Sequence, residues 1–155
     1  DINGGPAMLP EIAALVRKLP ELRIVINHVA NVRNDGKTLP DEWLQGMRDC
    51  SQGKQVFCKV SAIAEGATVR DSDGKASTDP GYYAPLLESV WRIWGDERLV
   101  YGSNWPVCLR ATAYADQLRV MLEFFRSKGA EATRRFFAGN ARSAYGWLDR
   151  TSDRS

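Results

Sequence analysis

The stretch Arg98-Leu99-Val100-Tyr101-Gly102-Ser103-Asn104-Trp105-Pro106-Val107 decides the fold. Its apolar run at 99–101 is typical of a short buried strand, and the Gly-Ser pair that follows favours a turn. The Trp-Pro pair then blocks helical geometry, so the strand ends here. In parallel barrels, strand ends deliver side chains to the active site. We therefore predict that Asn104 lies in such a site; an ordinary turn after a strand is the alternative.

Two further strands, each followed by a helical pattern, precede this stretch. We expect strands at 23–29, 55–63 and 99–104, and helices at 6–19, 40–50, 79–94, 113–128, 131–137 and 140–147. Asp79, Thr112 and Asn140 are the expected N-caps of three of these helices. Strand followed by helix, three times over, predicts an α/β fold with parallel pairing. The polar stretch 64–78 is expected to be an unpacked loop over the active-site face.

The length of the chain limits how much of a barrel it can form. A complete TIM (β/α)8 barrel takes about 250 residues, whereas this sequence has 155. We predict the C-terminal half of such a barrel: strands six to eight with their helices in one domain at 1–150, a remnant of an earlier strand at Asp1-Ile2, and a polar tail at 151–155. The exposed edges of a half-barrel predict self-association or pairing with the missing half.

Composition restricts the classes of partner. The 21 basic and 19 acidic residues give a formal charge of +2 without a dense basic block, so we expect no nucleic-acid partner. No apolar run approaches the roughly 18 residues of a membrane span, and no leader peptide is visible, so we expect no membrane association and a cytoplasmic location. Cys50, Cys58 and Cys108 are widely spaced, which favours buried free thiols over a disulfide framework or a cysteine-rich zinc site.

Polar residues at the three expected strand ends are the candidates for chemistry. Because the carboxyl ends of parallel barrel strands share one face, His28, Ser61 and Asn104 should converge. His28 is the only histidine; it could bind a carbonyl, ligate a metal or transfer a proton, and a purely structural imidazole is the alternative.

Three more residues are candidates for binding substrate. Lys59 lies two positions before Ser61 on one strand, so both face the same way, and Lys59 could hold a carboxylate or polarise a carbonyl. A salt bridge on the helix side is the competing interpretation for Lys59. Arg110 could grip a carboxylate, or be a solvated loop arginine. Trp105 could form a pocket wall, or belong to the core.

Four segments together resemble one family. Residues 98–107 are similar to the last barrel strand of the amidohydrolase-related TIM-barrel hydrolases, which include sugar lactonases and 2-pyrone-4,6-dicarboxylate lactonase. Residues 22–28 resemble the family's strand that ends in Asp-His, and residues 56–61 resemble its strand with lysine and serine. Residues 136–146 resemble its closing helix. The resemblance spans nearly all of residues 1–148.

The resemblance implies a hydrolase that opens a cyclic ester with water, with His28 and Asn104 as catalytic residues and Lys59, Ser61, Trp105 and Arg110 as substrate-binding residues. The family usually has aspartate, acting as general base or metal ligand, where this chain has Asn104. An amide cannot take up a proton at accessible pH, so that role does not pass to Asn104 unchanged. Asn27 likewise stands where the family often has aspartate.

Cofactor and activity stay open on the sequence. His28 and Asn104 are the only metal-ligand candidates, and a zinc site needs three or four protein ligands, so both no cofactor and one divalent ion in the complete barrel are compatible with the resemblance. The expected substrate is a small lactone or acidic carbonyl compound. The alternatives are a non-catalytic half-barrel that assembles through its strand edges, and a metal-dependent decarboxylase of the same superfamily.

Overall fold

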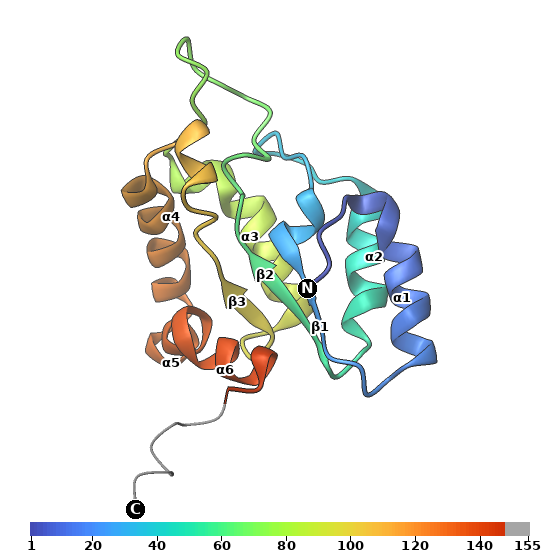
Figure 1. Cartoon of the computed structure of the whole chain (residues 1–155). Coiled ribbons are helices and arrows are strands. Elements are labelled where there is room, and N and C mark those ends of the chain that lie inside the picture. The colour runs from blue at the N-terminus through green and yellow to red at the C-terminus, as the bar shows by residue number, and fades with distance from the viewer. Residues whose placement is uncertain (148–155) are drawn as a thin grey trace, which may run out of the picture.

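A parallel three-stranded sheet forms the centre of the molecule (Figure 1). The computed structural model describes residues 1–147, and the predicted tail at 151–155 lies outside these residues. The strands are β1 (Ile24–Ile26), β2 (Val56–Val60) and β3 (Leu99–Tyr101), in the order β1-β2-β3. Both pairs are parallel, which confirms the α/β prediction.

The predicted remnant of an earlier strand is present beside β1. The Ile2 amide donates to the Val25 carbonyl at 2.8 Å, and the Asn27 amide donates to the Ile2 carbonyl at 2.9 Å. No strand of residues 1–147 pairs with the outer edge of β3. The expected self-association through strand edges stays a prediction.

Helices follow the strands in alternation. A short turn, η1 (Pro6–Met8), precedes the first of four helices: α1 (Leu9–Lys18), α2 (Asp41–Ser51), α3 (Pro80–Trp94) and α4 (Tyr114–Ser127). In Figure 1, α1 and α2 lie to the right of the strands, α4 lies to their left, and α3 lies behind them. Asp79 caps α3 as predicted, since its Oδ1 accepts from the Gly81 amide at 2.9 Å. The prediction for Thr112 was wrong: Ala113 is the N-cap residue of α4, and the Thr112 side chain is buried.

The chain closes with one continuous helical segment instead of the two predicted helices. It consists of α5 (Ala130–Arg134), a π-helical turn η4 (Arg135–Gly139) and α6 (Asn140–Tyr145). Asn140 does not cap a helix. Its buried amide donates to the carbonyls of Asp96 at 2.7 Å and Leu99 at 2.8 Å. This side chain therefore ties α6 to the beginning of β3.

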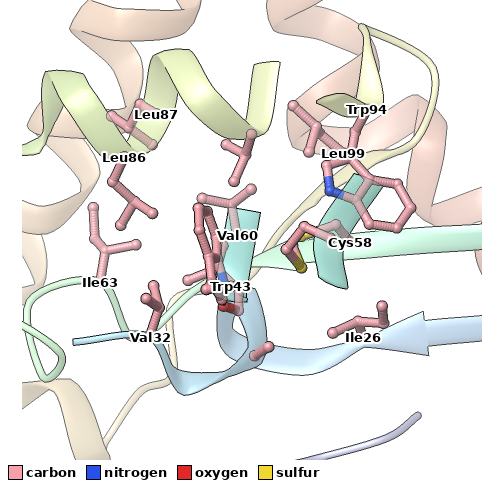
Figure 2. Packing of buried hydrophobic residues seen from close by; sticks show 14 of the residues in the cluster. Ile26, Val32, Trp43, Cys58, Val60, Ile63, Leu86, Leu87, Trp94 and Leu99 are labelled. Atoms are coloured by element: carbon pink, nitrogen blue, oxygen red, sulfur yellow. The ribbon is translucent and has the colours of Figure 1, made fainter. Parts of the chain in front are cut away.

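Most of the apolar core lies between the sheet and the helices, on what we call the helix side of the sheet. Alternate strand residues face it: Ile24, Ile26, Val56, Cys58, Val60 and Leu99. Figure 2 shows Leu86 and Leu87 of α3 above Val60, with Trp43 of α2 beside them. The indole of Trp43 also donates to the Val29 carbonyl at 2.8 Å. Every second residue of the strands and the apolar face of each helix are thus buried in one common core.

The opposite face, here the inner side, carries a smaller apolar group. Val25, Phe57 and Val100 pack there against Ala144 of α6. In a TIM barrel the face opposite the helices lines the barrel interior. The inner side is therefore the face on which a barrel active site is expected.

The three cysteines are free and buried, as predicted. Cys50 lies in α2 and Cys58 in β2, whereas Cys108 lies in the short turn η3 (Val107–Arg110). Burial raises the pKa of the Cys50 thiol to about 12 and also raises the pKa values of Cys58 and Cys108. All three are protonated at neutral pH.

Two expectations about segment boundaries need correction. The strands end earlier than predicted, because the chain turns into η2 (Asn27–Asn31) after β1 and into a turn at 63–66 after β2. Stretch 64–78 is also not wholly unpacked, since Ala67 and Ala76 are buried and form isolated bridges to Asn34 and Arg70. None of the helices in residues 1–147 is long and apolar enough to cross a membrane.

Candidate active site

Each strand leaves the sheet through a residue in the left-handed backbone region. The φ angles of His28, Ala62 and Asn104 are all 54°. This conformation costs a non-glycine residue roughly 1–2 kcal/mol, and it occurs where surrounding contacts hold the backbone in place. His28 begins a run of four such residues, which ends at Asn31. The amide group of Asn31 fastens that run by donating to Asn3 Oδ1 at 2.9 Å.

The first pair of site residues is His28 and Ser61. His28 Nδ1 and Ser61 Oγ lie 2.7 Å apart, which joins the exits of β1 and β2. Burial, and then the positive charge of Lys59, lower the pKa of His28, while the carboxylate of Glu65 opposes them. The imidazole is therefore neutral near pH 7, so Nε2 can accept or donate a hydrogen bond according to the tautomer.

The second pair is Asn104 and Glu65. Asn104 Nδ2 donates to Glu65 Oε1 at 2.7 Å, which joins the exit of β3 to the turn after β2. The other carboxylate oxygen, Oε2, is buried and has no hydrogen-bond partner among residues 1–147. Sequence reasoning missed Glu65, because it was counted within the polar stretch 64–78. The available signal was a carboxylate only four residues after Ser61, just beyond the end of the strand where the site was expected.

Lys59 lies on the inner side, but its ammonium group is already engaged. Nζ is 2.7 Å from Asp1 Oδ2 and stands 5.4 Å from the centroid of the Tyr145 ring. The predicted competitor, a salt bridge on the helix side, is not what the structure shows. Gly102 fits closely beside this group, since a Cβ there would lie 3.0 Å from the Cβ of Ser61 and 3.2 Å from Lys59 Cδ. A substrate-binding role for Lys59 stays a prediction.

Trp105 and Arg110 lie just beyond β3, on the surface. The Trp105 side chain is 65% exposed, so it is not part of the core. Arg110 is exposed at the end of η3 and forms no ion pair with another described residue. Within residues 1–147, the hydrogen bonds of the His28 and Asn104 side chains go to Ser61 and Glu65 and not to Trp105 or Arg110. Their substrate-binding roles also stay predictions.

The described residues do not make a metal site by themselves. Among residues 1–147, no group of three histidine, cysteine, aspartate or glutamate side chains is placed to hold an ion. The site offers one imidazole and one carboxylate, and the third polar group, Asn104, is a neutral amide that donates to that carboxylate. Because a zinc site needs at least three protein ligands, these described residues do not fit one by themselves.

A comparison with protein families shows the family to which the chain belongs. The amidohydrolase family model matches residues 1–147. The chain belongs to the amidohydrolase family. The resemblance expected from the four sequence segments is thereby confirmed, and the α/β fold is part of a TIM barrel.

Curated relatives of this amidohydrolase include lactonases. It is 30% identical over 153 residues to an L-fucono-1,5-lactonase of Burkholderia ambifaria, covering 95% of this chain and 49% of that protein. It is 23% identical over 116 residues to an L-rhamnono-gamma-lactonase of Scheffersomyces stipitis, covering 68% of this chain and 34% of that protein. The chain thus spans about half the length, or less, of the curated relatives that it matches.

Solved structures support the fold. An amidohydrolase from Burkholderia multivorans with bound zinc superposes with a TM-score of 0.78 at 23% identity, over 93% of this chain and 51% of that one. A putative 2-pyrone-4,6-dicarboxylic acid hydrolase from Pseudomonas putida gives a TM-score of 0.64 at 21% identity, over 89% of this chain and 49% of that one. At these identities the likeness concerns the fold alone.

Proposed function

We propose that the protein carrying this sequence hydrolyses sugar lactones, and that the strand exits described here form part of its active site. The observation that carries the proposal is the pairing of His28 with Ser61 beside the Asn104–Glu65 pair, at the exits of adjacent parallel strands. The names of the curated lactonase relatives support the choice of substrate class.

The reaction adds water to the lactone carbonyl and breaks the ring C–O bond, which yields an open-chain hydroxy acid. Ser61 holds the His28 ring through Nδ1, and a neutral imidazole can then direct Nε2 at the carbonyl oxygen or at water. Asn104 is oriented through its amide nitrogen, which leaves its carbonyl oxygen as an acceptor for a substrate hydroxyl or for water. The exposed Trp105 and Arg110 are the residues we assign to contact with the polyol part of the substrate.

Hydrolysis of a panel of sugar lactones, beginning with L-fucono-1,5-lactone, tests the proposal. Acid release above the spontaneous rate is followed with a pH indicator in the protein that carries this sequence. We expect turnover that His28→Gln lowers by about 10²–10⁴-fold, the range for loss of a positioned proton-transfer group. Lys18→Gln, an exposed change in α1, is the matched control and should leave the rate unchanged. A wild-type rate equal to the spontaneous rate across the panel would refute the proposal.

A further inference from the structure

Glu65 is held in place more firmly than an ordinary loop glutamate. The Arg70 guanidinium donates to its backbone carbonyl at 2.9 Å. The next residue, Gly66, is packed so closely that a Cβ there would lie 2.6 Å from the Val32 carbonyl oxygen, and its own carbonyl accepts from the Asn34 amide at 3.0 Å. The turn after β2 is therefore fixed against the segment after β1, so the backbone that carries the Glu65 side chain is held in place.

The carboxylate of Glu65 faces the candidate site. Oε1 accepts from Asn104 Nδ2, and Oε2 is buried without a partner among the described residues. Its negative charge acts on three titratable side chains around it: it opposes the lowering of the His28 pKa by burial and Lys59, and it adds to the raised pKa values of Tyr83 and Cys108. A buried carboxylate oxygen without a donor is an open acceptor position, and buried polar groups of this kind are normally satisfied by water or a ligand.

Asn104 and Glu65 together supply what Asn104 lacks alone. A hydrolytic base must accept a proton from water, which a carboxylate does and a neutral amide does not. The hydrogen bond between them places the Glu65 carboxylate directly against the Asn104 side chain. Resting on the proposed lactone hydrolysis, we propose that Glu65 is the general base and that Asn104 is a positioning residue which orients it.

A water O–H proton moves to the Glu65 carboxylate while the water oxygen forms a bond to the lactone carbonyl carbon, and the carbonyl π electrons move onto the carbonyl oxygen. When the carbonyl re-forms, the ring C–O bond breaks, and the leaving alkoxide takes the proton back from Glu65. The carboxylate is regenerated, and the net change is lactone plus water to hydroxy acid.

Exchanging the two partners tests the assignment. Glu65→Gln keeps an acceptor for Asn104 but removes the base, so we expect kcat to fall by about 10²–10⁴-fold with little change in KM. The double variant Glu65→Gln/Asn104→Asp restores one carboxylate to the pair, and we expect it to recover at least tenfold of that loss. Glu21→Gln, at an exposed position, is the matched control. Thermal unfolding of each variant shows whether it is folded.

The outcomes separate this inference from the proposed function. A wild-type protein that turns over no lactone overturns both. Turnover that survives in Glu65→Gln with the wild-type kcat and pH profile overturns only the role of Glu65. An acidic limb of the pH–rate profile that persists in Glu65→Gln but disappears in His28→Gln assigns the base to His28 and likewise overturns the inference. Loss of the limb in Glu65→Gln and its return in the double variant support it.

Discussion

The two sides of the sheet are packed to very different depths. On the helix side, alternate strand residues join one large core formed with α1 to α4. On the inner side, Val25, Phe57 and Val100 pack mainly against Ala144 and Ala141 of α6, and a charged residue, Lys59, stands in the same layer. The helix side thus provides stability within this chain, whereas the inner side leaves room for polar groups and chemistry.

The same valine-to-alanine substitution at positions 60 and 100 tests the difference in packing between the two sides of the sheet. Both are buried, Val60 on the helix side and Val100 on the inner side. We expect Val60→Ala to lower the free energy of unfolding by about 2–3 kcal/mol, because its surroundings cannot collapse. Val100→Ala should cost about 1–1.5 kcal/mol, because the short helix α6 can move toward the cavity. Urea denaturation measures both, and equal costs would contradict the contrast between the two sides.

A pair of alanine-to-glycine changes sharpens the contrast between regular elements and strand exits. Ala62 has a φ of 54° after β2, so Ala62→Gly should raise the free energy of unfolding by about 0.5–1 kcal/mol as backbone strain is removed. Ala14, exposed within α1, is the control, and Ala14→Gly should lower it by about 1 kcal/mol. If both changes destabilise the protein, the exit after β2 is not strained.

The smallest effect is a pH dependence from His28. Its pKa is lowered in the folded protein, chiefly by burial, so the unfolded chain binds the proton more readily. The stability that depends on a neutral imidazole is present above pH of about 6.5, the ordinary value, and is lost as the pH falls below it. The free energy of unfolding should therefore drop less steeply between pH 7 and pH 5 in His28→Gln than in the wild type. Parallel curves would show that burial of His28 has no such cost.

The parallel sheet and the four main helices were predictable from the sequence, because apolar periodicity and strand–helix alternation act locally. His28 and Ser61 were expected to meet at the strand ends, and their side chains do lie 2.7 Å apart, while the catalytic and binding roles of His28, Ser61 and Asn104 stay predictions. The left-handed turns were not predictable, since a β-branched residue such as Val29 is disfavoured there, and tertiary contacts such as the Trp43 hydrogen bond to the Val29 carbonyl stabilise the conformation. Glu65 was missed because its significance lies in a hydrogen bond across 39 positions to Asn104.

Asn140 shows the same limit in the closing helix. A local rule predicts a helix cap, since asparagine follows glycine at the beginning of an apolar pattern. The side chain instead satisfies two carbonyl groups near β3, including that of Leu99, which lies 41 positions earlier. The local capping preference is overridden because buried carbonyl groups need hydrogen-bond donors, and this need arises only in the folded chain.

The three buried thiols can report local opening of the folded protein. Cys50, Cys58 and Cys108 are each fully covered, in a helix, in the central strand and in the turn beyond β3. A thiol reagent can reach each one only when that layer opens, so the rate of alkylation at each cysteine measures a local opening event under native conditions. The chain therefore carries three native labelling sites, and the pKa of one of them, Cys108, is raised in part by the Glu65 carboxylate of the candidate site.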